Sequence, residues 1–398
     1  MPKKRPAKTK TVSVPDPVAA ARQTAAGIAT DRNGYLDATI GRILRDAPWV
    51  DHTAVLHGIA AYHRDAMGRI PPAARYPEAA PWVEYMLAYE RELRSAAHLD
   101  DAEIGLAMNL NAYLMFRGYR QCGARLHRPP QAEKCRVAVV PATDEGALWI
   151  KNVDDPPNHW HPEPPLPASQ PRRAWSWHRT PVHTDGVGSG LHLDDEPAEI
   201  FPLPVLQMWP HHAGDSPGVV EFLRRYSPFW SGANLVVADH QGRTVAIEKC
   251  SRGHFETFGP DPECGFTHIS GMVCRDPASP QGRYQQAKRA EYRRLFNLPD
   301  DGPDAEFWGR CDAAERRLVD GLRRLGPKPR AEDVIRLFWT PYPNGLCKDG
   351  RRFHADAGHT EYTLITHAVL IDRRQVRRWQ RSQDCQTWPE QPEICQYG

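Results

Sequence analysis

The chain has 398 residues, and its 51 basic and 49 acidic side chains leave a net charge of +2. This near balance argues against a polyanion-binding protein, because nucleic-acid-binding domains usually carry a strong basic excess or stripe. No apolar stretch approaches the length of a membrane span, and none of the nine cysteines forms a C-x-x-C pair, so no zinc knuckle or redox dithiol is indicated. We therefore expect a cytoplasmic protein with reduced thiols, no nucleic-acid or membrane partner, and no metal or cofactor.

The N-terminal third is predicted to be helical. Residues 1–20 include a basic run and are expected to form a disordered tail. Residues 82–97 place their apolar side chains broadly on one helical face, and Asp100 or Asp101 is a candidate N-cap for the next helix. We assign residues 21–134 to a helical leader that precedes the main domain, residues 135–398.

Strand signals begin after the two prolines at positions 129 and 130. The run 137–140 is rich in valine, residues 143–146 (TDEG) predict a turn, and residues 147–150 predict a second strand. This hairpin starts at Cys135. Residues 234–248 repeat the strand–turn–strand pattern and predict a second hairpin.

The second half of the chain mixes helices with strands. Ser216 and Pro217 are suited to the N-cap and first position of a helix that extends to residue 226. Residues 284–296 and 312–325 also have helical spacing, and residues 364–371 predict a strand followed by a turn. A helical segment followed by mixed strands and helices indicates an α+β fold of packed sheet and helix layers.

Cys135 is the candidate nucleophile, because it lies between the helical leader and the first predicted strand. If the chain were cleaved before Cys135, its new α-amine would titrate near pH 7.7–8.0 and serve as a general base for the thiol. Asp154 ends the paired strand, so we expect its carboxylate to lie near Cys135. Judged by spacing alone, a small buried side chain is the commoner role for a cysteine that starts a strand.

Several further motifs lie before and after Cys135 in a definite order. They are Lys134-Cys135-Arg136, Asn152-Val153-Asp154, the segments 101–114, 185–195 and 233–248, and the late motifs Leu346-Cys347-Lys348 and Thr363-Leu364. Across residues 82–378 this order resembles the acyl-coenzyme A:6-aminopenicillanate acyltransferase family, the C45-type autoproteolytic amidohydrolases.

The resemblance implies an N-terminal-nucleophile αββα sandwich that matures by self-cleavage between Lys134 and Cys135. It implies that Cys135 is nucleophile and, through its α-amine, base, and that Asp154, within the Asn152-Val153-Asp154 motif, supports it. The implied reaction transfers an acyl group from a small acylated amine, peptide or acyl-CoA to water or an amine, as in specialised metabolism. The cleaved halves would remain together as an αβ heterodimer.

The sequence departs from the family pattern at several positions. The glycine before the nucleophile is Lys134 and the following threonine is Arg136. The family's oxyanion asparagine falls at His268, which can still donate one hydrogen bond to an oxyanion. The position that a later arginine occupies in the family corresponds to the region of Thr360 in this sequence, so that arginine is absent here. Candidate substrate-binding residues are Arg136, Asp185 and Asn234.

Two other classes of function are considered. The departures at Lys134, Arg136 and His268 also fit an unprocessed relative that binds a ligand or partner. A metal oxygenase would use an H-x-D motif, but four such motifs in a chain with 18 histidines are expected by chance. The H-x-D motifs are His98-Asp100, His183-Asp185, His192-Asp194 and His354-Asp356.

Overall fold

The structure is a computed structural model. It describes residues 16–30, 32, 52–68, 80–108, 136–155, 174–175, 179–180, 215–226, 233–239, 241–249, 255–261, 265–270, 278, 283, 286, 290, 316–341, 344–350 and 362–396. The helices are α1 (Pro17–Thr30), α3 (His52–Gly68), α4 (Ala80–Ala97), α7 (Ser216–Tyr226) and α10 (Ala331–Trp339), with further helical turns at 101–108 and 316–325. The strands are β1 (Arg136–Thr143), β2 (Gly146–Asp155), β3 (Ala174–Trp175), β4 (Arg179–Thr180), β5 (Ala233–Asp239), β6 (Thr244–Lys249), β7 (Phe255–Phe258), β8 (Thr267–Ser270), β9 (Tyr362–Leu370), β10 (Gln375–Gln380) and β11 (Glu393–Gln396).

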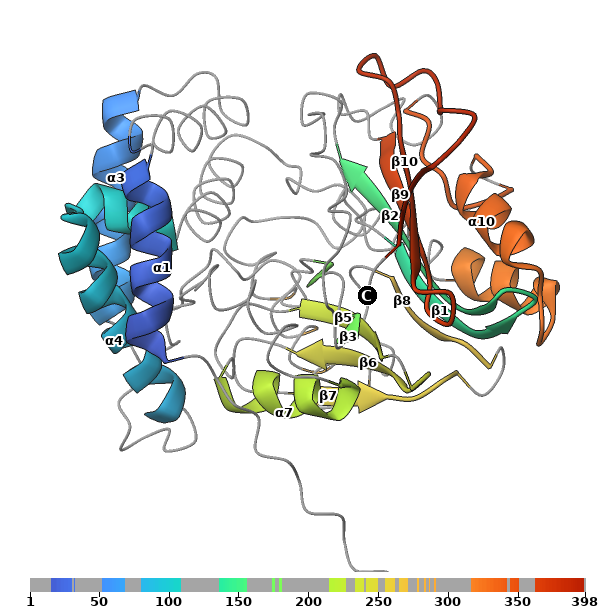
Figure 1. Cartoon of the computed structure of the whole chain (residues 1–398), viewed down its shortest axis with the longest axis horizontal. Helices are drawn as coiled ribbons and strands as arrows, with labels where there is room; N and C mark the ends of the chain where they lie inside the picture. Colours follow the sequence, from blue (N-terminus) through green and yellow to red (C-terminus); the bar gives the residue numbers. More distant parts are fainter. Residues whose placement is uncertain are drawn as a thin grey trace, which may run out of the picture.

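The N-terminal helices form a group in which α1 lies along α4 (Figure 1). The hydroxyl of Tyr89 donates to Thr24 Oγ1 at 2.8 Å across this contact. Helix α1 begins at Pro17, because Asp16 Oδ2 accepts a hydrogen bond from the Ala19 amide at 2.9 Å. The prediction of a disordered tail over residues 1–20 is therefore wrong for residues 17–20, which belong to α1. Residues 1–15 lie outside the described part.

The predicted helix at 82–97 is confirmed as α4, and Asp100 caps the helical turns that follow it. Asp100 Oδ1 accepts hydrogen bonds from the amides of Ala102 and Glu103, and Glu103 Oε2 accepts one from the Asp100 amide, all at 2.9 Å. This reciprocal pattern is a capping box. Asp101, the other candidate cap, instead forms ion pairs with Arg64 and Arg94.

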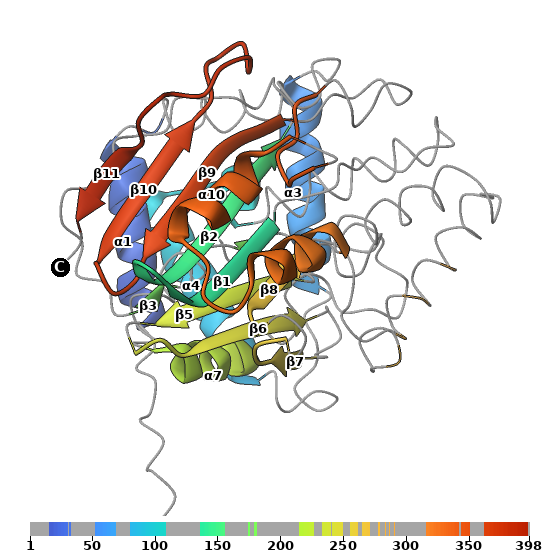
Figure 2. The same ribbon diagram turned by 90° about the vertical axis from the view of Figure 1, so that its right-hand side faces the viewer.

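A six-stranded antiparallel sheet has the order β11-β10-β9-β2-β1-β8 (Figure 2). The hairpin predicted from residue 135 is confirmed as β1 and β2, with Val139 opposite Trp149. The predicted strand at 364–371 is β9, which pairs with β2 on one side and β10 on the other. Strands β1 and β2 therefore lie inside this sheet, protected on both edges.

The second sheet has the order β3-β5-β6-β7, and β4 also pairs with β5. The second predicted hairpin is confirmed as β5 and β6, and the predicted helix after Ser216 is α7. The N-cap differs from the expectation: Asp215 Oδ1 accepts the Gly218 amide at 2.8 Å, whereas the Ser216 hydroxyl donates to the carbonyl of Arg243 at 2.9 Å. Ser216 thus ties α7 to the hairpin instead of capping it.

The two sheets face each other across an apolar layer. Because side chains alternate along a strand, Val137, Val139 and Trp149 point into this layer and meet Val236 and Ala246 of the second sheet. The alternate residues of β1 and β2 pack on the other face against α10 and the turns at 316–325, and these residues are Ala138, Val140, Leu148 and Ile150. Helix α7 lies along β5 and β6 on the outside of the second sheet (Figures 1 and 2). The α+β class is confirmed.

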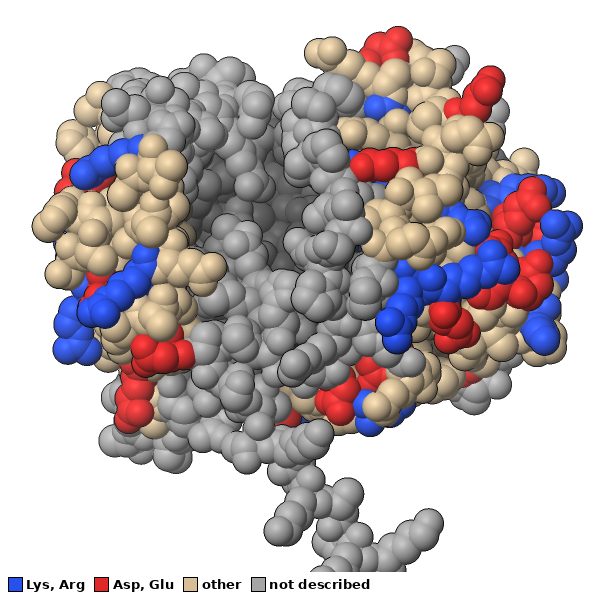
Figure 3. All heavy atoms as spheres, in the orientation of Figure 1, with Lys and Arg blue, Asp and Glu red and all other residues tan. Residues whose placement is uncertain are grey.

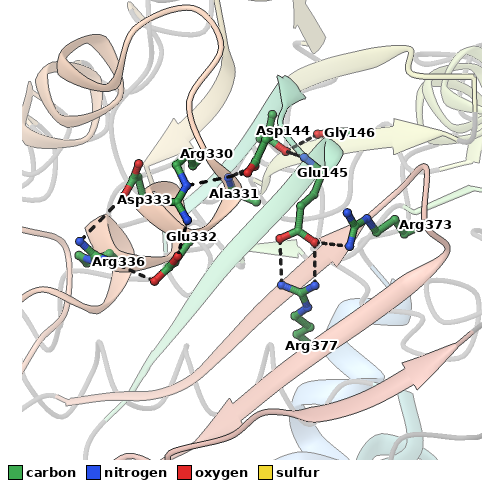
Figure 4. Close-up of polar contacts among 11 residues, drawn as sticks. Asp144, Glu145, Gly146, Arg330, Ala331, Glu332, Asp333, Arg336, Arg373 and Arg377 are labelled. Carbon is green, nitrogen blue, oxygen red and sulfur yellow. Dashed lines mark hydrogen bonds and ion pairs between the residues drawn. The ribbon is translucent and has the colours of Figure 1, made fainter.

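The β1–β2 turn contacts both α10 and the β9–β10 segment (Figure 4). Asp144 Oδ1 accepts the amide of Ala331 at 2.7 Å and so supplies a cap for α10. Glu145 forms ion pairs with Arg373 at 2.7 Å and Arg377 at 2.8 Å. Basic and acidic side chains are interleaved over this part of the surface (Figure 3), in keeping with the balanced net charge.

Among the described helices, none combines the length and the hydropathy needed to cross a bilayer.

Candidate functional site

Lys134 and Cys135 lie outside the described residues, and Arg136 is the first described residue after them. Arg136 is the first residue of β1, which hydrogen-bonds to β2 on one side and β8 on the other. Consecutive Cα atoms are about 3.8 Å apart. A single peptide bond therefore joins Cys135 to the start of an inner strand.

Asp154, the predicted supporting carboxylate, is buried near the end of β2. Its Oδ2 lies 3.3 Å from Arg136 Nη1 and 3.7 Å from Lys348 Nζ, and its Oδ1 accepts a hydrogen bond from Thr363 Oγ1 at 2.7 Å. Burying a charge is costly unless it is paired and hydrogen-bonded, and this carboxylate has both kinds of partner. We call Arg136, Asp154, Lys348 and Thr363 the Asp154 cluster.

Lys348 and Thr363 were not predicted as site residues. The Lys348 amide donates to Thr363 Oγ1 at 2.8 Å, and the Thr363 amide donates to the Lys348 carbonyl at 2.9 Å. Both residues belong to motifs that carry the family resemblance, and the structure brings those motifs together at Asp154. One sequence signal could have pointed to Lys348, which directly follows the apolar pair Leu346-Cys347. A lysine beside apolar residues is a candidate for burial, and a buried lysine needs an acidic partner such as Asp154.

Asn152 lies opposite Arg136 in the β1–β2 register, and its polar atoms contact the protein frame. Its Nδ2 donates to the carbonyls of Phe338 at 2.9 Å and Leu346 at 3.4 Å, while its Oδ1 accepts from Thr366 Oγ1 at 2.9 Å. The side chain thus fastens the end of α10 to sheet strands β2 and β9. These hydrogen bonds of the Asn152 side chain all go to the protein frame.

His268, the predicted oxyanion donor, is buried in β8 directly opposite Ala138 of β1. Directly opposite residues share a face of the sheet, and Ala138 packs on the α10 side. His268 Nε2 is 3.4 Å from Asp261 Oδ2. The imidazole is therefore on the same face as the side chains of Ala138 and Phe266.

The three candidate substrate-binding residues have different surroundings. Arg136 is 1% exposed and its guanidinium contacts Asp154. Asn234 lies in β5 with its backbone opposite Thr180 and Glu248, and its side chain is outside the described set. Asp185 lies outside the described residues, as do residues 181–214 around it.

A second thiol, Cys347, borders the Asp154 cluster. Its sulfur is buried and lies 3.1 Å from Arg381 Nη2. Burial raises the pKa of the Cys347 thiol above its ordinary value, and the adjacent Arg381 guanidinium opposes that shift. Because the thiolate is the reactive form, Cys347 has the character of an inert core cysteine.

The one H-x-D motif within the described residues belongs to a helix junction. His98 has a positive φ of 52° at the end of α4, and Asp100 caps the next helix. In the part of the chain that the structure describes, no three His, Cys, Asp or Glu side chains are grouped so that they could hold a metal ion.

No known family model and no curated protein match this sequence. The Asp154 cluster is therefore the candidate site, and one peptide bond joins its Arg136 to Cys135.

Proposed function

We propose that the chain is a cysteine-dependent amide hydrolase or acyltransferase of the N-terminal-nucleophile type, with Cys135 as nucleophile. The observation that carries this proposal is the position of Arg136. Arg136 follows Cys135 directly, begins an inner strand and contacts the buried Asp154 carboxylate at 3.3 Å. Rigid support of this kind is what a catalytic side chain needs to hold its geometry.

The layer order supports the proposal. Two antiparallel sheets stacked face to face, with α10 outside one and α7 outside the other, correspond to the αββα sandwich that the resemblance implies. In such an arrangement the proposed nucleophile would precede an inner strand of one sheet, as Cys135 does. Fold alone does not determine activity, so the argument for chemistry rests on Cys135 and its neighbours.

The proposed maturation is one peptide-bond hydrolysis. The Cys135 thiol attacks the Lys134 carbonyl carbon, the C–N bond breaks, and the acyl group moves from nitrogen to sulfur. One water molecule then hydrolyses the thioester, which leaves a carboxylate on Lys134 and a free α-amine on Cys135. Lys134 in place of the family's glycine makes this step the first to test.

The proposed turnover uses the same atoms. The α-amine takes the thiol proton, and the sulfur attacks the substrate's acyl carbon. The amine or thiol leaving group departs with that proton and leaves an acyl-thioester on Cys135. Water or an acceptor amine then attacks the thioester and regenerates the thiol. No cofactor enters these steps.

The Asp154 cluster would act by positioning. Its carboxylate links β1, β2, β9 and the segment after α10 through Arg136, Thr363 and Lys348. This linkage would hold the first residue of β1, and with it the residue before, at a fixed place. Active sites lose much of their rate when such support shifts the reacting group by about 1 Å.

Alkylation mapping tests the nucleophile. The protein as purified, with any cleaved chains still associated, would be treated with iodoacetamide below the amount that modifies all nine cysteines, and modified peptides would be quantified over time. We expect Cys135 to react at least about tenfold faster than a free thiol, because its adjacent amine raises the thiolate fraction. Cys347 should remain unmodified, and Asp154→Asn should slow the reaction of Cys135.

The controls separate this proposal from a binding protein. Cys135→Ala should abolish the fast alkylation, while Cys347→Ala should leave it unchanged. If Cys135 reacts no faster than an ordinary thiol in folded protein, it is not an activated nucleophile. An unprocessed, ligand-binding relative would then be the better account.

A further inference from the structure

Arg381 directly follows β10 and carries a buried guanidinium. The residue is 6% exposed, and its amide donates to the carbonyl of Leu364 in β9 at 2.8 Å. Its Cζ lies 4.8 Å from the ring centroid of Trp388 and 5.7 Å from that of Tyr362. A planar cation is attracted to the faces of aromatic rings, so these contacts restrict the guanidinium. The backbone and the side chain of Arg381 are therefore both held in place.

The guanidinium connects two stretches of backbone. Its Nη1 donates to the carbonyl of Cys385 at 2.7 Å, in the turn that follows Arg381. Its Nη2 donates to the Cys347 sulfur at 3.1 Å and lies 3.5 Å from the carbonyl oxygen of Lys348. Because a guanidinium presents its N–H donors in a fixed fork, one side chain fixes the two stretches relative to each other. The contact with the carbonyl does not involve the sulfur, so Cys347→Ala should keep it.

Lys348 is the residue through which Arg381 reaches the Asp154 cluster. The Lys348 carbonyl accepts the amide of Thr363 at 2.9 Å in addition to its contact with Arg381. The ammonium nitrogen of Lys348 lies 3.7 Å from Asp154 Oδ2. A lysine side chain is a flexible stem, so the position of its backbone decides whether the ammonium reaches the carboxylate.

We propose that Arg381 is a positioning residue of the proposed reaction: it fixes the backbone of Lys348 so that the ammonium stays against Asp154. Asp154 also contacts Arg136, the residue after Cys135. The influence of Arg381 on Cys135 rests on the proposed function, whereas its effect on Lys348 does not. Arg381 acts through this chain of contacts and takes no part in bond making.

Nuclear magnetic resonance of lysine ammonium groups tests the effect on Lys348. The protein as purified, labelled with nitrogen-15 in lysine, would be studied at neutral pH, where an exposed ammonium exchanges its protons with water too fast to be observed. We expect a signal from Lys348, because its ammonium is buried and paired, and Lys348→Arg assigns that signal. Arg381→Met should lower the signal at least about threefold, because a less constrained backbone opens to water more often.

Lys151 supplies an internal reference for this measurement. Lys151 is 4% exposed, and it follows Ile150, which packs on the α10 side, so the alternation of side chains places Lys151 on the other face of β2. Its signal, assigned with Lys151→Arg, should persist in Arg381→Met. A general loosening of the sheet would weaken both signals and would overturn the proposal. Arg336→Met removes a guanidinium that is 66% exposed on α10 and should change neither signal.

A charge-preserving variant keeps the test decisive. Arg381→Lys retains the cation but replaces the fork by a single ammonium, so the Lys348 signal should be weaker than in the wild type and stronger than in Arg381→Met. This variant decides the test if circular dichroism shows that Arg381→Met does not fold. The proposal is overturned by a Lys348 signal of wild-type intensity in the folded Arg381→Met protein, or in Arg381→Lys where only that variant folds. Absence of a Lys348 signal in the wild type would overturn it as well.

Iodoacetamide labelling then measures the effect on Cys135. Cys135 should react at least about threefold more slowly in Arg381→Met than in Arg336→Met, because a small displacement of supporting groups lowers the rate at a reacting group. If Cys135 reacts fast in the wild type and equally fast in Arg381→Met, Arg381 does not position the reaction. If wild-type Cys135 reacts like an ordinary thiol, the proposed function fails, and the ammonium signals alone decide whether Arg381 holds Lys348.

Discussion

At the scale of single residues, Asp154 and His367 lie on opposite faces of one sheet, and their surroundings have opposite effects on charge. Asp154 is buried with two cations and a hydroxyl within contact distance. His367 is buried between two cations and is therefore kept neutral. The first arrangement stabilises a charge, whereas the second excludes one.

The exclusion of charge at His367 predicts an acid-sensitive stability. Its folded pKa, about 3, is below the ordinary value of 6.5, so between these values the unfolded chain binds the extra proton. The stability contribution is complete above pH 6.5 and is lost as the pH falls toward 3. At pH 5 the loss from this one group should be about 2 kcal/mol relative to pH 7.

Replacing His367 by glutamine should remove this part of the acid slope. The measurement is the free energy of unfolding by urea at pH 7, 6 and 5, compared with the wild type. His57→Gln, at an exposed position in α3, is the matched control and should retain the wild-type slope. If His367→Gln and the wild type have the same slope, then His367 has the same pKa in the folded and the unfolded chain, and the prediction is wrong.

At the scale of secondary-structure elements, the β1–β2 hairpin depends on its glycine. Gly146 has a φ of +97°, and a Cβ at this position would lie 2.2 Å from Asp372 Oδ2. Asp372 Oδ2 in turn accepts the Ala147 amide at 2.9 Å. Gly146→Ala therefore combines backbone strain with a collision and should destabilise the fold by about 2–4 kcal/mol.

The β5–β6 hairpin has a matched control. Gly242 has a φ of +72° and open space around the position of a Cβ. Gly242→Ala therefore contains the strain without the collision and should cost about 1 kcal/mol. Urea unfolding of both variants measures the difference. If the two substitutions cost the same, the contact with Asp372 contributes nothing.

Local sequence predicted the elements whose signals were strong. Both hairpins have valine-rich strands around a glycine turn, and α4 has a regular apolar face, so all three were identified. Strand β10 was not predicted, because the half-buried Arg377 and the buried Arg378 within QVRRWQ interrupt the apolar alternation. Helix α10 was also not predicted. Its cap, Asp144, is 187 residues away in the chain and leaves no local signal.

The candidate site was predictable only in part for the same reason. Asp154 was identified from its place after Asn152 at a strand end. Thr363 is 209 residues away from Asp154, so their contact depends on the pairing of β2 with β9 and not on any local pattern. The neighbouring positions of Lys151, His367 and Arg378 likewise arise only when three strands that are far apart in the sequence come into register. No local pattern distinguishes any of the three residues in the sequence.

At the scale of the whole molecule, the proposed cleavage site lies between two parts of different construction. Before it, α1, α3 and α4 form a helical group, and after it the chain forms the stacked sheets. Helix α4 contacts α7 of the second part. Cleavage between Lys134 and Cys135 would therefore leave two chains that remain associated, in keeping with an αβ heterodimer.

Intact mass spectrometry under denaturing conditions tests this account most directly, because only cleavage gives Cys135 a free α-amine. We predict two chains that correspond to residues 1–134 and 135–398, and a single 45.0 kDa chain for Cys135→Ala. A single full-length chain in folded wild-type protein would contradict the account. Cys135 would then have no amine of its own to act as a base.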